Sequence, residues 1–270
     1  MRPVIALLSD FGMRDHYVGA MKGVILGICP DVTIVDITHG IAPHDVLGGA
    51  LQLAGAYKFF PAGTIFVAIV DPGVGSARRG LAAEVGDYRF IAPDNGVLTV
   101  VFRESTPKRV VELTERRYAR PTVSRTFEGR DRFAPAAAWL AKGIQLPALG
   151  RAVPKFHTLE IPQVQEQDGV LVGTVLTVDH FGNLVTNIDR RTFDRFLHVQ
   201  ADAASSPRTE LTVGGAPIGR IVATYADIHA GEACGLFGST DHLEIALNAG
   251  SAADTLGLGR GAEVVVKRHV

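Results

Sequence analysis

Residues 64–79 read TIFVAIVDPGVGSARR, a run of strand-forming residues that ends at an aspartate and a glycine-rich turn. The first seven residues are mostly apolar and β-branched or aromatic, which predicts a buried strand. Asp71 follows directly, and Arg78 and Arg79 follow the turn. Open α/β sheets bind ligands beyond the carboxyl ends of their strands. The stretch therefore predicts an α/β sheet with a charged site at its edge; a surface Asp–Arg pair on an ordinary glycine turn is the alternative.

The first half of the chain alternates strand and helix patterns around this stretch. We expect strands at 4–9, 32–38 and 64–70, helices at 17–29, 45–59 and 134–142, and a hairpin at 81–92 that turns at Gly86-Asp87. Alternating strands and helices favour a mainly parallel sheet that is covered by helices on both faces.

The second half has a different pattern. Prolines at 147, 154 and 162 indicate that residues 145–168 form a connector. Beyond it, we expect strands at 169–178, 184–188, 210–213, 218–225, 233–237, 243–247 and 262–267, with one short helix at 251–256. Short strands separated by turns predict a small barrel or sandwich. The expected fold class is α/β: an N-terminal, mainly parallel α/β sandwich domain at 1–155 and a smaller, barrel-like all-β domain at 156–270.

Composition narrows the class of partner. The 270 residues are 47% hydrophobic and 20% charged, with a net charge of −1, which is typical of a globular protein. This charge gives no long-range attraction to nucleic acid or to an anionic membrane, so a small-molecule partner is favoured. Apolar runs fall short of the roughly 20 residues of a membrane helix. Cys29 and Cys234 form no disulfide framework, so we expect a cytoplasmic protein.

Asp10 is a second carboxylate at the predicted end of a strand, within the stretch Ser9-Asp10-Phe11-Gly12. Its two acceptor oxygens match the adjacent hydroxyls of a ribose. The alternative is an aspartate that caps the following helix, because aspartate is a favoured capping residue.

Residues 126–133, TFEGRDRF, place four charged residues of both signs between two aromatic residues. A solvated charge run is the usual explanation of such a stretch. However, Phe127 and Phe133 would anchor it against a core, so we expect some of its charges to be partly buried. Glu128 is the candidate base.

Two segments of the second half also carry polar groups. Asp179 could pair with an ammonium group, and Asn183 could present a donor and an acceptor to a purine edge. A simple hairpin turn is the alternative there. Ser239 and Thr240 could bind a carboxylate. The histidines and cysteines show no metal-ligand spacing, so no metal site is predicted.

Together these segments resemble the S-adenosylmethionine hydroxide adenosyltransferase family, whose relatives include fluorinase and chlorinase enzymes. Ordered motifs over most of a chain are more specific than any one of them. The resemblance rests on Ser9-Asp10-Phe11-Gly12, Cys29-Pro30-Asp31-Val32, Asp71-Pro72-Gly73-Val74-Gly75 with Arg78-Arg79, Ala92-Pro93-Asp94-Asn95-Gly96, residues 127–131, residues 179–183, and Asn248-Ala249-Gly250.

The resemblance implies a two-domain fold, a homotrimer and S-adenosylmethionine as the small-molecule substrate. Asp10 would then hold the ribose diol, Asp179 the methionine amine and Ser239 its carboxylate. Asn183 and the backbone of Ala249 would bind adenine. The remaining residues expected to contact substrate are Tyr17, Phe127 and Tyr225.

The resemblance also implies a catalytic set. Family hydrolases position water with an Asp–Arg–His set, and Asp71 and Arg78 match its first two members. At the third position this chain has Glu128 where the family usually has histidine. An ordinary glutamate, with a pKa of about 4.3, is a weaker base than imidazole. Burial would raise the pKa of this carboxyl and Arg78 would lower it. Glu128 therefore replaces the histidine as base, reflects an engineered change or marks a slower enzyme.

The expected reaction is hydrolysis of S-adenosylmethionine to adenosine and L-methionine by water at ribose C5′, without a cofactor. The halide-using relatives have tyrosine at the position of Asp71 and serine at that of Gly129, which disfavours a halogenase. An adenosyl-binding protein with little turnover is the other alternative, because of Glu128.

Overall fold

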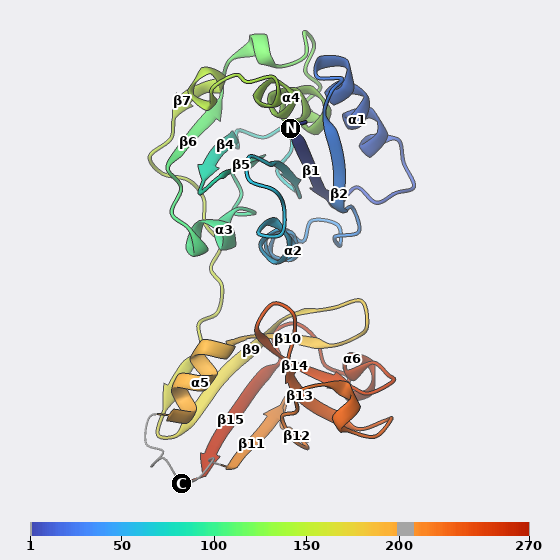
Figure 1. The fold of residues 1–270 in the computed structure, drawn as a ribbon, viewed down its shortest axis with the longest axis vertical. Coiled ribbons are helices and arrows are strands. Elements are labelled where there is room, and N and C mark those ends of the chain that lie inside the picture. The colour runs from blue at the N-terminus through green and yellow to red at the C-terminus, as the bar shows by residue number, and fades with distance from the viewer. Residues whose placement is uncertain (1, 199–207, 270) are drawn as a thin grey trace. The chain divides into compact units, whose positions relative to one another are not determined.

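The computed structural model describes residues 2–198 and 208–269. The chain divides into two compact units, one up to Leu159 and one from Glu160 onward (Figure 1). Separate hydrophobic clusters form the cores of the two units. The division lies close to the predicted boundary after residue 155.

A seven-stranded sheet forms the centre of the first unit. Its strands, in spatial order, are β2 (Thr33–Thr38), β1 (Val4–Ser9), β3 (Ile65–Ile69), β5 (Tyr88–Pro93), β4 (Gly80–Val85), β6 (Arg109–Leu113) and β7 (Gly150–Ala152). The strands from β2 to β5 run parallel, and the remaining three pair antiparallel. The switch occurs at the two-residue turn Gly86-Asp87, because a turn this short can only join antiparallel strands.

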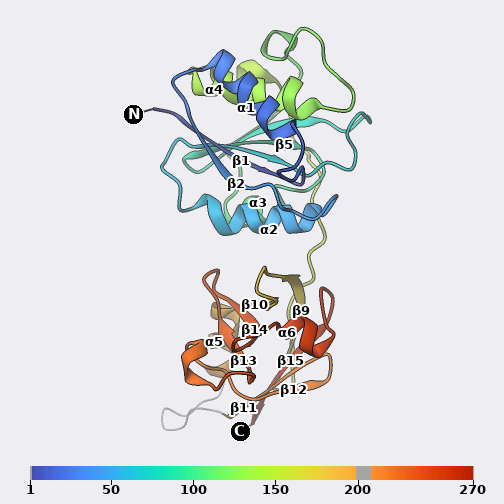
Figure 2. The same ribbon diagram turned by 90° about the vertical axis from the view of Figure 1, so that its right-hand side faces the viewer.

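Helices cover both faces of this sheet, as predicted. α1 (Tyr17–Ile28) and α4 (Ala134–Ala141) lie on one face, and α2 (Val46–Tyr57) and α3 (Thr99–Glu104) lie on the other (Figure 2). In β1, Ile5 and Leu7 belong to the core under α1 and α4, whereas Ala6 and Leu8 belong to the opposite core. Burial on both faces explains why the strand reads as a continuous apolar run.

Several elements of the first unit lie outside the predicted set. They are α3, β6, β7, a π-helix at Gly129–Phe133 and two 3₁₀ turns at Arg116–Tyr118 and Leu146–Leu149. The π-helix continues directly into α4. It turns the charged segment 126–133 into an ordered element, and this element forms part of the site described below.

An eight-stranded, barrel-like sheet dominates the second unit. Its strands, in order, are β12 (Ala216–Ile218), β11 (Arg208–Val213), β15 (Glu263–His269), β9 (Val170–Val178), β10 (Leu184–Asp189), β14 (His242–Leu247) and β13 (Ala233–Phe237), while β8 (Gln165–Gln167) pairs with β9. These neighbours pair antiparallel. Ile221, just after β12, bridges to Gly235 of β13 and nearly closes the sheet. The predicted fold class is confirmed.

The predicted strand at 218–225 is wrong. Only Ile218 belongs to a strand, and Tyr225 begins a 3₁₀ turn, Tyr225–Asp227. Asp227 accepts hydrogen bonds from the backbone N–H groups of Ala223 and Thr224, and Thr224 caps the turn in return. This local capping box competes with strand pairing for the same backbone groups.

Two helices complete the second unit. The short α6 (Ala252–Leu256) was predicted, and Ser251 caps it with its hydroxyl group. α5 (Arg190–His198) was not predicted, because four of its nine residues are charged. Phe193 and Phe196 hold α5 against the barrel core. The predicted connector at 145–168 also contains β7 and β8.

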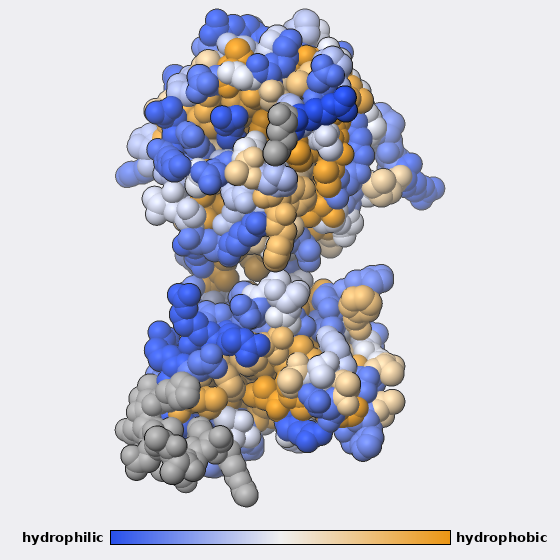
Figure 3. Space-filling model, viewed as in Figure 1, coloured by the Kyte–Doolittle hydropathy of each residue, from blue (hydrophilic) through white to orange (hydrophobic). Residues whose placement is uncertain are grey.

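Hydrophilic residues cover much of the visible face of each unit, with hydrophobic residues interspersed among them (Figure 3). Among the residues that the structure describes, we find no helix with the length and apolar character needed to cross a membrane.

Candidate active site

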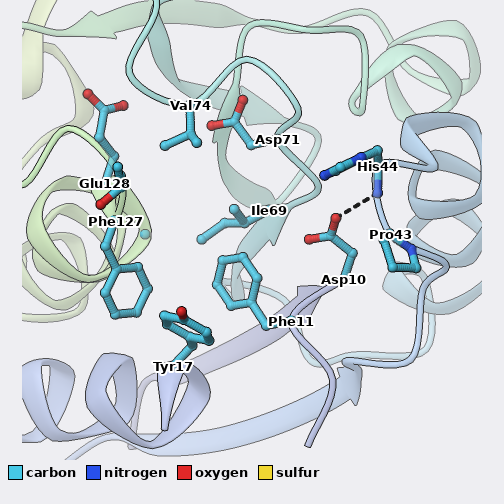
Figure 4. Close-up of a pocket in the computed structure, with 12 residues that line it drawn as sticks. Asp10, Phe11, Tyr17, Pro43, His44, Ile69, Asp71, Val74, Phe127 and Glu128 are labelled. Carbon is cyan, nitrogen blue, oxygen red and sulfur yellow. Dashed lines mark hydrogen bonds between the residues drawn. The ribbon is translucent and has the colours of Figure 1, made fainter. Parts of the chain in front are cut away.

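A cavity of about 320 Å³ lies where β1 and β3 end in the first unit. Asp10 follows β1 directly, and Asp71 follows β3 after one residue, so the parallel pairing of these strands brings both aspartates to the same edge. The cavity is lined by Asp10, Phe11, Tyr17, Pro43, His44, Ile69, Asp71, Val74, Thr126, Phe127, Glu128 and Gly129 (Figure 4). Ligand crevices at this edge are usual in open α/β sheets, as the sequence predicts.

Asp10 lies on one wall of the cavity and contacts the loop after β2. Its Oδ2 accepts a hydrogen bond of 2.9 Å from the backbone N–H of His44 (Figure 4). The capping alternative for Asp10 is wrong, because α1 begins at Tyr17 and its N-cap residue is His16.

Asp71 and Arg78 form a bidentate ion pair. Arg78 Nε lies 3.0 and 2.8 Å from the two carboxylate oxygens of Asp71, and Arg78 Nη2 also donates to Oδ2. The side chains are 5% and 9% exposed, so the alternative of a surface pair is wrong. The turn between them requires glycine at position 75, where φ is +78° and a Cβ atom would lie 2.5 Å from the Arg125 carbonyl oxygen.

Glu128 extends this pair into a chain of alternating charges. Its Oε2 lies 2.5 Å from Arg78 Nη2, and its Oε1 accepts a hydrogen bond of 3.0 Å from Arg132. Arg132 is fixed in turn by a hydrogen bond of 2.5 Å to the carbonyl oxygen of Leu113. Burial alone would lower the pKa of Arg78, but the hydrogen bonds and charges of Asp71 and Glu128 outweigh it and raise that pKa above its ordinary value.

Aromatic rings form the other side of the cavity. The ring centroid of Tyr17 lies 5.8 Å from that of Phe11 and 5.0 Å from that of Phe127. These rings lie opposite the carboxylates of Asp71 and Glu128 (Figure 4). The cavity therefore combines an apolar side, suited to the flat or aliphatic parts of a ligand, with a charged side where chemistry can occur.

Asp131 organises the segment that carries Phe127 and Glu128. Its side chain is 0% exposed and accepts two hydrogen bonds from Arg130 and one from the backbone of Ser124. Burial alone would raise the pKa of Asp131, but the hydrogen bonds and the charges of Arg130 and Arg120 hold it below its ordinary value. The expectation that some charges of this stretch are buried is confirmed.

A second polar group lies in the barrel unit. Asp179 accepts hydrogen bonds from the backbone N–H groups of Phe181 and Asn183 and, at 2.8 Å, from the Asn183 side-chain amide. The same amide nitrogen donates to the Tyr225 hydroxyl at 3.3 Å. Asp179 therefore caps a turn, and the side-chain amide nitrogen of Asn183 is engaged within this group.

Glu244 belongs to this second group but was not singled out from the sequence. Burial, and then the charge of Asp179, raise the pKa of the Glu244 carboxyl above its ordinary value. Burial also raises the pKa of Tyr225, and Glu244 and Asp179 add to that effect. The sequence did contain a signal for Glu244, a glutamate at an inward-facing position of β14. A carboxylate is rarely buried in a protein core without a partner, so such a glutamate indicates a polar site.

Ser239 and Ala249 lie in loops of the same unit. Ser239 is exposed after β13, and Ala249 is exposed after β14 with a φ of +60°. Among the described residues, no hydrogen bond joins either of them to Asp179 or Asn183. Five of the predicted site residues thus line one cavity: Asp10, Tyr17, Asp71, Phe127 and Glu128. Arg78 contacts the carboxylates of Asp71 and Glu128 from outside the cavity lining. Three others, Asp179, Asn183 and Tyr225, form a separate hydrogen-bonded group.

In the described ranges, no group of three or more His, Cys, Asp or Glu side chains could hold a metal ion.

Two family models match the chain in order. The model of the SAM hydroxide adenosyltransferase N-terminal domain matches residues 5–150, and that of the C-terminal domain matches residues 173–265. The chain belongs to the SAM hydroxide adenosyltransferase family. The resemblance seen in the sequence motifs is confirmed, and the family's two domains correspond to the α/β unit and the barrel unit.

Individual relatives within this family are similar in sequence to this chain over nearly its whole length. A protein named (R)-S-adenosyl-L-methionine hydrolase from Thermus thermophilus is 36% identical over 98% of this chain and 99% of its own. A protein of the same name from Salinispora tropica is 39% identical over 96% of this chain and 95% of its own. A fluorinase from Nocardia brasiliensis is 31% identical over 98% of this chain and 97% of its own. The crystal structure of an uncharacterized conserved protein from Thermotoga maritima covers 98% of this chain and 100% of its own with a TM-score of 0.89 and 36% identity.

Proposed function

We propose that the protein hydrolyses S-adenosyl-L-methionine to adenosine and L-methionine. The observation that carries this proposal is the pair of carboxylates, Asp71 and Glu128, held around Arg78 at the wall of the cavity. The cavity volume of about 320 Å³ is at the low end of small-ligand pockets, which span about 300–1,000 Å³. Relatives named (R)-S-adenosyl-L-methionine hydrolase, 36–39% identical over nearly the whole chain, support the same reaction.

The reaction needs alignment more than acid catalysis. A water oxygen forms a bond to ribose C5′ while the bond from C5′ to the sulfonium sulfur breaks. The electron pair stays on sulfur, which leaves as the neutral thioether of methionine, and the water proton passes to a carboxylate and then to solvent. A neutral leaving group requires no proton donor, so orienting the water and partly removing its hydration supply the catalysis. We therefore propose a reaction without a cofactor.

Asp71 and Glu128 are the proposed proton acceptors, and Arg78 is proposed to position them. The two carboxylates line the cavity, whereas Arg78 lies outside its lining and contacts both of them. Asp71 Oδ1 and the two Glu128 oxygens each have one arginine contact, so either residue keeps a lone pair that can accept a hydrogen bond from water. Two anionic groups would also repel a halide ion, which favours neutral water as the nucleophile.

Substrate contacts are proposed from both groups of side chains. Asp10 would bind the ribose diol, and Tyr17 and Phe127 would pack against the apolar parts of the ligand. Asp179 would bind the methionine ammonium group. The remaining proposed contacts are Asn183 and the backbone of Ala249 to adenine, Ser239 to the methionine carboxylate, and Tyr225.

One observation favours a second candidate, a protein that binds an adenosyl ligand with little turnover. Both oxygens of Glu128 are occupied by arginines, Oε2 by Arg78 and Oε1 by Arg132. The two guanidinium groups compete with water for the carboxylate oxygens, which weakens Glu128 as a base.

Incubation with S-adenosylmethionine, with and without chloride, separates these functions when products are followed by chromatography. We expect adenosine to form with time in the wild type and to be lost in Asp71→Asn. Asp87→Asn is the matched control, because Asp87 is exposed in the hairpin turn at the other end of the sheet. Bound ligand without product would support the binding protein, and a 5′-chloro product would identify a halogenase.

We also propose that the protein is a cytoplasmic homotrimer, as the family resemblance implies. Size-exclusion chromatography with light scattering would test the assembly. A mass of one chain, 28.7 kDa, would contradict it.

A further inference from the structure

A serine–histidine–aspartate group, in which the serine and the histidine are buried, lies next to Asp10. Ser9 Oγ lies 2.7 Å from His39 Nδ1, and His39 Nε2 lies 3.1 Å from Asp36 Oδ1. Lys22 completes the series through a hydrogen bond of 2.6 Å from Nζ to Asp36 Oδ2. Ser9 is 1% exposed and His39 is 4% exposed.

This group has the composition of a hydrolytic triad but not its accessibility. A serine nucleophile must reach a substrate atom. Ser9 is buried, lies outside the cavity lining, and accepts a hydrogen bond of 3.2 Å from the backbone N–H of Phe11. Its hydroxyl group is therefore engaged in holding the backbone.

The contacts of the group favour one orientation of the Ser9 hydroxyl group. The Asp36 carboxylate, paired with Lys22, can only accept, so its charge favours the His39 tautomer with the proton on Nε2, although the 3.1 Å contact between Nε2 and Oδ1 lacks the alignment of a hydrogen bond. His39 Nδ1 is then an acceptor, and the Ser9 hydroxyl donates to it. The Ser9 oxygen in turn accepts from Phe11, which fixes the first residue after Asp10.

The loop after β2, which begins at His39, makes two further hydrogen bonds to the loop that carries Asp10. The carbonyl oxygen of His39 accepts a hydrogen bond of 2.8 Å from the backbone N–H of Gly12. The backbone N–H of His44 donates to the Asp10 carboxylate at 2.9 Å. Three hydrogen bonds thus join the loop that carries Asp10 to the loop after β2. One is made by Ser9, before Asp10, one by Gly12, after it, and one by the Asp10 carboxylate itself.

We propose that Ser9, His39 and Asp36 are positioning residues that fix the Asp10 carboxylate for the vicinal hydroxyls of a ribose. They thereby set the preference of the site for ribosyl over 2′-deoxyribosyl ligands. This inference rests on the proposed function, in which Asp10 holds the ribose diol. A carboxylate binds both hydroxyl groups of a vicinal diol only when its two oxygens face them. A small rotation of the loop therefore weakens the preference for ribosyl ligands while the protein remains folded.

The test compares S-adenosylmethionine with its 2′-deoxy analogue in the wild type and in Ser9→Ala. We expect the ribosyl preference in kcat/KM to fall about tenfold in Ser9→Ala, mostly through KM, which is less than the about 10²-fold cost of a 1 Å misplacement. His39→Ala should behave in the same way. His39→Asn keeps an acceptor near the position of Nδ1 and should recover part of the preference.

Thr64→Ala is the matched control for loss of a buried hydroxyl group. Thr64 is 1% exposed, donates a hydrogen bond of 2.7 Å to the Pro61 carbonyl oxygen, and lies just before β3 at the opposite end from the cavity. We expect a melting temperature lowered as much as in Ser9→Ala, with an unchanged ribosyl preference.

Calorimetric binding of adenosine and 2′-deoxyadenosine separates this inference from the proposed function. If the wild type forms no adenosine, hydrolysis is refuted, and the same variants are compared by binding. A ribosyl preference that survives in Ser9→Ala and His39→Ala overturns the inference. So does a wild type that does not distinguish the two nucleosides.

Discussion

Arg132 places Nη1 3.0 Å from Oε1 of Glu128, four residues earlier in the chain. Glu128 is the N-cap residue of the π-helix Gly129–Phe133 and Arg132 lies within that helix, where the carbonyl oxygen of Leu113 fixes it. Glu128 is consequently held between Arg132 and Arg78, with both of its oxygens paired. Its orientation toward the cavity depends on this clamp.

We predict that Arg132→Met lowers kcat about tenfold and destabilises the fold. Hydrogen bonds to charged groups contribute about 1.5–3 kcal/mol, and partial exposure of Arg132 places its contribution near the lower figure. Arg117→Met is the control, because Arg117 is 67% exposed and pairs with Glu115 at 3.7 Å. Steady-state kinetics and thermal melts check both variants. An unchanged kcat in Arg132→Met would mean that the clamp has no catalytic role.

Glu128 itself can be tested with two replacements. Glu128→Gln keeps the shape but removes the charge, and we predict a loss of about 10²-fold in kcat, the lower end for general-base catalysis. Glu128→His should also lower the rate, because Arg132 then loses its counter-charge. The double variant Glu128→His with Arg132→Gln should recover activity, since a neutral imidazole next to Arg78 remains a proton acceptor. Rates that are simply additive in this cycle would contradict the coupling.

Gly75→Ala should displace the turn that joins Asp71 to Arg78. At a φ of +78°, its Cβ atom would lie 2.5 Å from the Arg125 carbonyl oxygen. Backbone strain of this kind costs about 1–3 kcal/mol, and the contact adds to it. Gly86→Ala is the control, because Gly86 has a φ of +56° with nothing within 4 Å of the added atom. We expect both variants to melt earlier and only Gly75→Ala to lose activity; equal kinetics would contradict this account of the turn.

The pH dependence of stability should reveal Glu244. Burial and the nearby Asp179 raise the pKa of its carboxyl in the folded state. The folded state therefore holds this proton more tightly, and ionisation costs stability as pH rises from the unfolded value of 4.5 through the raised folded value. Glu244→Gln should raise the melting temperature at pH 8 and give little gain at pH 4. Glu263→Gln, at an exposed position, is the control; a gain that is equal at both pH values would contradict the assignment.

Local sequence patterns predicted the elements whose own residues settle their conformation. The apolar run of β3 is buried on both faces, and Gly86-Asp87 makes a two-residue hairpin whatever surrounds it. The pattern failed where side chains compete for backbone groups. At 218–225 the β-branched residues suggested a strand, but the Thr224–Asp227 capping box formed a turn. In α5 the charged residues obscured the helical spacing of the apolar residues. Phe193 and Phe196 are buried and stabilise the helix against the barrel core.

The amino-acid sequence by itself determined the two-unit fold class, the aspartates at strand ends and the membership of a family, because these follow from local periodicity and ordered motifs. Only the tertiary structure decided which charges meet. Asp71, Arg78, Glu128 and Arg132 form one chain of ion pairs, Glu244 lies near Asp179, and His39 reaches Ser9 across the sheet edge. Such contacts join residues far apart in sequence or on an unpredicted π-helix, and their strength depends on burial, which arises only when the whole chain packs.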